Sequence, residues 1–137
     1  TQYATNKMLL NKELYKNHYV NSSNIYHFIT TEMCNILQKS KLKYVKPNAA
    51  WYMLINFEAY KKELNEINIF DGIELSNFLL EKLHIISVAG EHFNINGLNI
   101  RFSFIDFKYN MNQAEKIDIS NMTQGFKMLV DFLHSLK

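Results

Sequence analysis

The clearest alternation of hydrophobic and polar positions lies between residues 98 and 104. Arg101 and Ser103 fall on one side of an extended chain there, because successive side chains of a strand point to opposite faces. The apolar positions on the other side are Ile100, Phe102 and Phe104. This pattern predicts a strand that packs one face against a core and leaves the other face polar.

A second strand is predicted just before it, over residues 84–88, where β-branched side chains predominate. The Ala-Gly pair at residues 89–90 ends that strand, and the Asn-Gly pair at residues 96–97 is typical of a hairpin turn. Residues 84–107 are therefore expected to form a strand, a tight glycine loop, a turn and the strand that carries Arg101.

Similar patterns predict the elements that precede this segment. Residues 43–46 and 50–57 read as strands, and the second has apolar side chains on both sides, which is typical of a central strand. A short helix and a loop are expected over residues 58–70. Asp71 and Glu74 then form a capping-box pattern, which predicts a helix ending near residue 83.

Residues 7–40 are expected to be helical. Apolar residues recur there on one face at three- and four-residue steps: Ile25, Ile29, Met33, Ile36 and Leu37. The polar segment 21–23 either caps a second helix or forms a polar patch on one long helix. After a polar, irregular stretch over 108–119, a last helix begins at Ser120. Its inward side chains are Met122, Phe126, Leu129, Val130, Leu133 and Leu136.

This order of elements predicts an α+β fold, in which a small mixed β-sheet has helices packed on one face and is preceded by a long helix. We assign residues 1–41 to that helix and residues 42–137 to the domain that follows it. The length of 137 residues suits one such unit, and its 47% hydrophobic residues can fill a core.

Composition excludes some classes of function. A net charge of +2 gives no electrostatic basis for binding nucleic acid or an acidic membrane. No apolar run approaches the length that spans a membrane. Cys34 is the single cysteine, so the chain forms no internal disulfide, which suits a reducing compartment such as the cytoplasm.

Arg101 is the one distinctive candidate for chemistry, since the sequence shows no Ser/His/Asp set, no cluster of metal ligands and no phosphate-binding glycine loop. Of fifteen Lys and Arg residues it is the only arginine, and the other fourteen are lysines. Arginine presents a rigid fork that grips a carboxylate through two hydrogen bonds, whereas lysine is a point charge. Arg101 is therefore either an anion-binding residue or, as is commoner for charged residues, a solvated or salt-bridged side chain.

Four motifs together resemble the small, C-terminal domain of fold-type I, pyridoxal-phosphate-dependent aminotransferases. They are PNAAWYM at residues 47–53, VAGEHF at 88–93, IRFSF at 100–104 and GFKML at 125–129. Their order and rough spacing agree with that family over residues 42–137, and the long helix before them resembles the element that connects its two domains. Alanine stands at position 89 where the family has proline, and at positions 49 and 50 where glycine is common.

The resemblance implies that Arg101 binds the α-carboxylate of an amino-acid or 2-oxo-acid substrate, with Ala49, Gly90 and Phe93 bordering the active site. It also implies a pyridoxal 5'-phosphate cofactor bound by a preceding large domain, which supplies the lysine that forms a Schiff base with it. No lysine here lies in such a context, and no metal is expected. The chain would then be the C-terminal part of a transaminase, inactive alone and homodimeric when complete.

Other readings stay open. The domain could belong to a pyridoxal-phosphate-dependent carbon–sulfur lyase, which shares this small domain. It could instead be a non-catalytic, aminotransferase-like interaction module. A sheet-based RNA binder is the third reading. It requires Phe102 and Phe104 to be exposed beside Arg101 on a basic surface, and a net charge of +2 without a glycine-aromatic signature argues against it.

Overall fold

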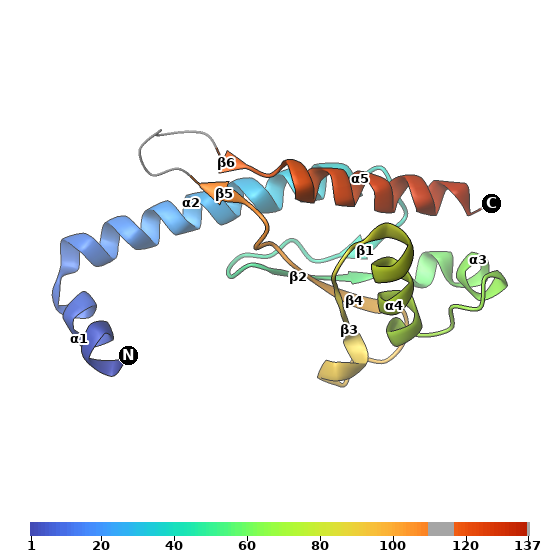
Figure 1. Ribbon diagram of the computed structural model, residues 1–137, viewed down its shortest axis with the longest axis horizontal. Helices are drawn as coiled ribbons and strands as arrows, with labels where there is room; N and C mark the ends of the chain where they lie inside the picture. The colour runs from blue at the N-terminus through green and yellow to red at the C-terminus, as the bar shows by residue number, and fades with distance from the viewer. Residues whose placement is uncertain (110–116, 137) are drawn as a thin grey trace.

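The computed structural model describes residues 1–109 and 117–136 of the chain. It confirms the α+β class, with helices packed against a small β-sheet (Figure 1). The helices are α1 (Gln2–Leu10), α2 (Lys12–Leu37), α3 (Lys61–Glu66), α4 (Gly72–Leu83) and α5 (Ser120–Ser135). The strands of the main sheet are β1 (Lys43–Tyr44), β2 (Tyr52–Asn56), β3 (Val88–Ala89) and β4 (Asn99–Ser103). Short 3₁₀ helices follow β2 and β3, namely η1 (Glu58–Tyr60) and η2 (Gly90–Phe93).

The main sheet has the strand order β1-β2-β4-β3, and every adjacent pair in it is antiparallel. The prediction of a mixed sheet is therefore wrong. The connection from β2 through α3 and α4 does bring β3 back in the same direction as β2, as a helical crossover usually does. However, β4 lies between β2 and β3 and runs against both of them, so no parallel pair forms.

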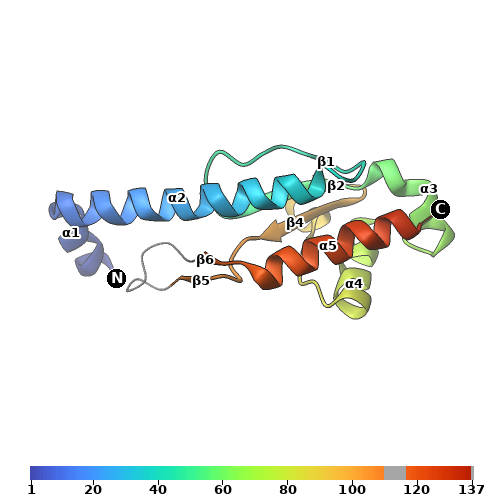
Figure 2. The same cartoon turned by 90° about the horizontal axis from the view of Figure 1, so that it is seen from above.

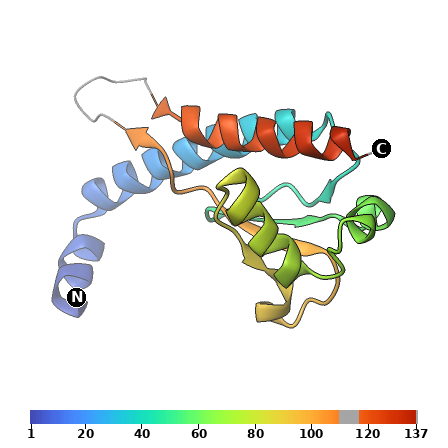
Figure 3. The same cartoon turned by 45° about the vertical axis from the view of Figure 1, so that its right-hand side comes forward.

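One face of the sheet is packed and the other is open. Helices α2, α4 and α5 lie on the packed face, where α2 runs beside α5 and α4 lies next to β3 and β4 (Figures 2 and 3). The predicted alternation in β4 is confirmed, because Ile100, Phe102 and Phe104 belong to the buried core. We define the open face by the side chains that point the opposite way: Tyr52, Leu54, Asn56, Val88, Asn99, Arg101 and Ser103.

The two amphipathic helices pack as their patterns predicted. Ile29, Met33 and Leu37 of α2 are fully buried, and α5 buries Met122, Phe126, Leu129, Val130 and Leu133. Helix α2 is continuous through residues 21–23, so that segment is a polar patch on one long helix. The helical stretch is interrupted instead at Asn11, and α1 before it has no buried residue. In the described residues, no helix is both long and apolar enough to cross a membrane.

Helix α4 has the predicted cap, and its C-terminal end corrects another prediction. The Asp71 side chain accepts a hydrogen bond from the Glu74 N–H at 2.8 Å, while the Glu74 carboxylate accepts one from the Phe70 N–H at 2.7 Å. The strand predicted over residues 84–88 is wrong, since only Val88–Ala89 forms β3. His84 adopts a left-handed conformation with a φ of 56°, so it and Ile85 close the helix through hydrogen bonds to its last carbonyls.

The stretch expected to be irregular between α5 and the main sheet contains paired strands. Strand β5 (Lys108–Tyr109) pairs in antiparallel register with β6 (Ile117–Asp118). Tyr and Ile are residues with high β-propensity, which the polar residues around them obscured in the sequence. The remainder of that prediction, residues 110–116, lies outside the described residues.

Candidate functional site: a clamped arginine on the open face

Arg101 lies at the centre of the open face. In the register of the sheet it is opposite Leu54 of β2 on one side and Val88 of β3 on the other. The side chain is half-buried, and its position is fixed by the alternation that sends Ile100 and Phe102 into the core. A cation at this place rises from a rigid strand rather than from a loop, which favours a precise geometry.

Two aromatic rings hold the guanidinium group. Its Cζ lies 4.4 Å from the ring centroid of Tyr52 and 4.4 Å from that of Phe93. We name this pair of rings the aromatic clamp. Contacts with ring faces are favourable for a weakly hydrated guanidinium, and they leave its N–H groups unused. Because both rings are only partly buried, at 38% and 42% exposure, the clamp is reachable from solvent.

Arg101 has no acidic partner within the described residues. The salt bridge found there joins Lys61 to Glu58 at 3.2 Å and lies elsewhere. The Arg101 Nε atom is buried and makes no hydrogen bond to any residue that the structure describes. A buried donor without an acceptor destabilises a fold by about 1–3 kcal/mol, so the fold gains no stability from this N–H group. The structural ion pair that the sequence left open is thus not formed in this part of the chain.

The structure brings together two of the predicted border residues and leaves the third apart. Phe93 belongs to the clamp, and Gly90 begins the short helix η2 that carries it. A Cβ atom on Gly90 would lie 2.7 Å from the Ile95 carbonyl oxygen and 2.9 Å from the Asn99 Cβ, so only glycine fits that turn. Ala49 lies instead at a separate cavity.

That cavity, of about 310 Å³, lies between α2 and the segment that leads into β2. Its wall includes Ala49, Tyr26 and Trp51. The Trp51 ring contacts Tyr26 at 6.0 Å and Tyr52 at 5.3 Å between centroids, so aromatic contacts run from the cavity to the clamp. Ala50 beside it has a φ of 60°, a left-handed conformation that favours glycine.

Tyr52 is the residue that sequence reasoning missed. The alternation of residues 50–57 placed it on the same side as Leu54, and an antiparallel partner strand would have brought it near Arg101. The pairing of β2 with β4 was the missing information: Tyr52 is opposite Ser103, two pairs along the sheet from Leu54 and Arg101 and on the same face. Tyr52 also lines a broad depression of about 730 Å³ that continues along β1 and β2.

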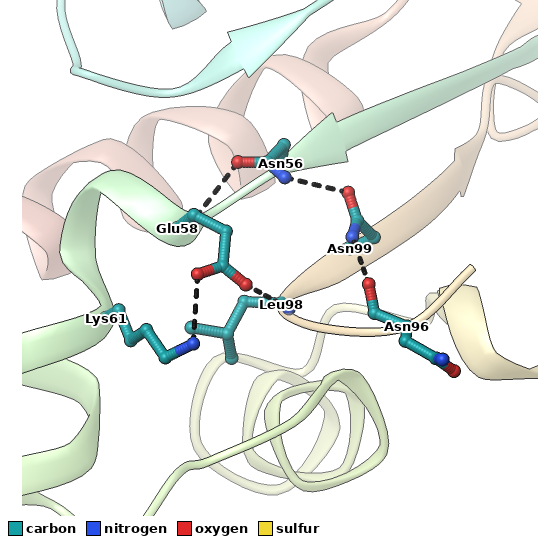
Figure 4. Close-up of polar contacts among 6 residues, drawn as sticks. All are labelled: Asn56, Glu58, Lys61, Asn96, Leu98 and Asn99. Atoms are coloured by element: carbon teal, nitrogen blue, oxygen red, sulfur yellow. Dashed lines mark hydrogen bonds and ion pairs between the residues drawn. The ribbon is translucent and has the colours of Figure 1, made fainter.

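A polar network fixes the end of the hairpin that starts β4 (Figure 4). Asn56 Nδ2 donates to Asn99 Oδ1 at 3.0 Å, which ties β2 to β4 on the open face. The Leu98 N–H donates to Glu58 Oε1 at 3.1 Å, and Lys61 Nζ donates to the other carboxylate oxygen at 3.2 Å. The hydrogen bond from Leu98 is the main reason that the pKa of the Glu58 carboxyl lies below its ordinary range.

The site is suited to binding an anion and offers little else. Within the described residues there is no group of three or more His, Cys, Asp or Glu side chains that could hold a metal ion. Every described lysine side chain is exposed, whereas a lysine that reacts with a carbonyl cofactor needs a desolvated amine. Of the other candidate ligands on α2, His27 is exposed and Cys34 is buried.

No family model matches the chain, and no curated protein matches it. The arrangement of the clamp, the open face and the helices is therefore the basis for a functional proposal.

Proposed function

We propose that this chain is the C-terminal small domain of a pyridoxal-phosphate-dependent aminotransferase, in which Arg101 binds the α-carboxylate of the amino-acid or 2-oxo-acid substrate. The complete enzyme would transfer an amino group between such acids, as a homodimer in the cytoplasm. This proposal extends the sequence resemblance, and the observation that carries it is the clamped guanidinium of Arg101, which has no acidic partner in the described residues.

The clamp suits a carboxylate better than other anions of equal charge. A guanidinium fork offers two parallel N–H groups that match the two oxygens of a carboxylate. The guanidinium Cζ lies 4.4 Å from the ring centroids of Tyr52 and Phe93, and such ring contacts do not use the N–H groups that a ligand would need. Holding the fork still before the ligand arrives reduces the entropy lost on binding.

The cofactor is proposed to lie on another domain. The exposed lysines described above do not fit the role of the residue that holds pyridoxal phosphate covalently. When bound, that cofactor supplies the electron sink for reactions at the α-carbon. The part proposed for this chain is to bind and orient the substrate carboxylate.

The three rival functions differ from this one in different ways. A carbon–sulfur lyase with the same small domain would use the same carboxylate contact, so it differs only in the products formed. A non-catalytic interaction module would use the fork for a carboxylate of a partner protein, so it differs in binding no cofactor and no free amino acid. The third rival is contradicted by the packing, because Phe102 and Phe104 are 3% and 1% exposed and lie against Phe126, where no RNA base can stack on them.

The complete protein provides the test. We expect it to bind pyridoxal phosphate, seen as visible absorbance, and to convert a 2-oxo acid to an amino acid with a second amino acid as donor. Release of a thiol and ammonia from a sulfur amino acid, without transamination, would favour the lyase. A complete protein that binds no cofactor would overturn both. As a matched control, borohydride should trap no cofactor on the present chain alone.

A further inference from the structure

The ring of Phe93 owes its position to the short helix η2. This segment closes on itself, because the Ile95 N–H donates to the Gly90 carbonyl at 3.0 Å and Asn94 takes a left-handed conformation with a φ of 58°. On one side it continues from β3, which pairs with β4. These contacts shape the turn, but they do not join it to the helices of the packed face.

Glu91 makes that connection. Its Oε1 accepts a hydrogen bond from the Gly72 N–H, the first residue of α4, at 2.9 Å. The approach is close enough that a Cβ atom on Gly72 would lie 2.5 Å from the other carboxylate oxygen, so glycine makes room for the carboxylate. The contact uses an N–H group that has no partner inside the helix, at the end where the helix dipole favours a negative charge.

The stability of α4 alone does not explain this contact. Helix α4 already has a capping residue, Asp71, whose carboxylate accepts the Glu74 N–H at 2.8 Å. Glu91 Oε2 is moreover buried with no hydrogen-bond partner in the part of the chain that the structure describes. Burying a carboxylate with one oxygen unsatisfied opposes folding. A second cap that buries an unsatisfied carboxylate oxygen is better explained by the segment that it holds in place. That segment is η2, which carries Phe93 two residues after Glu91.

We propose that Glu91 is a positioning residue, which fastens η2 to the start of α4 and thereby keeps the Phe93 ring against the Arg101 guanidinium. The substrate-binding consequence rests on the proposed function, whereas the effect on the clamp does not. Releasing Glu91 removes the hydrogen bond that joins η2 to α4, and η2 is then held only at its two ends, by the two-residue strand β3 and by the turn that leads into β4. The Phe93 ring then leaves Arg101, and the fork becomes free to rotate.

The chain offers an unusually direct readout, since Arg101 is its only arginine. A ¹H–¹⁵N spectrum therefore contains a single arginine Nε–Hε signal, which the ring currents of Tyr52 and Phe93 displace. The variants to compare are Glu91→Ala, Glu91→Asp, Asp71→Ala and Phe93→Leu. Asp71→Ala is the matched control, because it also removes a carboxylate from the N-terminal end of α4 but leaves η2 fastened.

We expect Asp71→Ala and Glu91→Ala to lower the melting temperature to a similar extent, and only the Glu91 variants to move the arginine signal toward its position in Phe93→Leu. Glu91→Asp keeps the charge and is one methylene too short to reach Gly72, so it should behave like Glu91→Ala. Affinity for acetate, measured on the same signal, should fall at least about threefold in the Glu91 variants and stay unchanged in Asp71→Ala.

Each other outcome has a definite meaning. An arginine signal that stays in place in both Glu91 variants overturns the proposal. Loss of folding in both of them, with Asp71→Ala still folded, also overturns it, since Glu91 would then be a residue of general stability. If the signal moves as expected but acetate never binds to the unaltered chain, the positioning role stands and the proposed function fails.

Discussion

Replacing Arg101 with lysine in the proposed aminotransferase is the most specific perturbation of the proposed site. Lysine keeps the positive charge and can still lie against the clamp rings, but it cannot offer two parallel N–H groups to a carboxylate. One charge-assisted hydrogen bond in a desolvated site contributes on the order of 1.5–3 kcal/mol. We therefore expect kcat/KM to fall roughly tenfold to a hundredfold.

The assay compares substrates that share one feature. The loss should appear with every amino acid tested, because all of them carry the α-carboxylate, and it should be much smaller for an amine that lacks this group. The melting temperature should change little, since Arg101 has no ion pair to lose within the described residues. Lys43→Gln is a suitable control, because Lys43 is paired with Asn56 on the same sheet and removal of its charge leaves the fork intact.

A purely structural role of Arg101 predicts a different result. If Arg101 served only to stabilise the fold, Arg101→Lys would lower the melting temperature and would affect amines and amino acids alike. A variant with that behaviour would refute the assignment of Arg101 as the carboxylate-binding residue.

Three further predictions follow from particular features of the fold. The chain alone should bind a hydrophobic dye and self-associate, because Tyr3 and Leu9 of α1 are 74% and 57% exposed; a monomer that binds no dye at high concentration would contradict this. Ala50→Gly should raise the free energy of unfolding by up to about 1 kcal/mol, because glycine adopts a φ of 60° without strain; an unchanged or lower denaturation midpoint would argue against strain there. The pKa of Glu58 is lowered chiefly by the hydrogen bond from Leu98, so Glu58 should stabilise the fold fully above the ordinary glutamate pKa of about 4.3. This stability should be lost as the pH falls through the lower pKa of the folded state. Glu58→Gln should therefore flatten the acid side of a plot of melting temperature against pH, and a plot parallel to that of the unaltered chain would contradict the contribution.

Periodicity predicted much of the packed half of the molecule. The buried faces of α2, α5 and β4 follow from apolar spacing alone, because burial imposes the same period as the backbone. The ends of elements were harder. His84 adopts a left-handed conformation at the C-terminal end of α4. Ile85, which has high β-propensity, therefore donates a hydrogen bond to the end of that helix and does not begin a strand. The antiparallel sheet depended on β4 inserting between β2 and β3, which is a long-range choice that local sequence does not encode.

The candidate site was predictable only in part. A solitary arginine on the polar side of a strand is visible in the sequence, and so is the nearby Phe93. The contact of Tyr52 with the guanidinium depends on the pairing of β2 with β4. The hydrogen bond between Glu91 and Gly72 depends on how η2 lies against α4. Both are tertiary contacts between segments far apart in the sequence, and the order of these segments along the chain does not tell which of their residues meet.

Titration of the single arginine Nε–Hε signal with small ligands tests the central claim most directly. Acetate and L-alanine carry a carboxylate, ethylamine does not, and chloride at equal ionic strength controls for screening. We expect the signal to shift in a saturable way with acetate and alanine only, with a Kd of about 1–30 mM, which corresponds to roughly 2–4 kcal/mol of net binding. A signal that does not move, or that moves alike with acetate and chloride, would contradict the assignment of Arg101 as a carboxylate-binding residue.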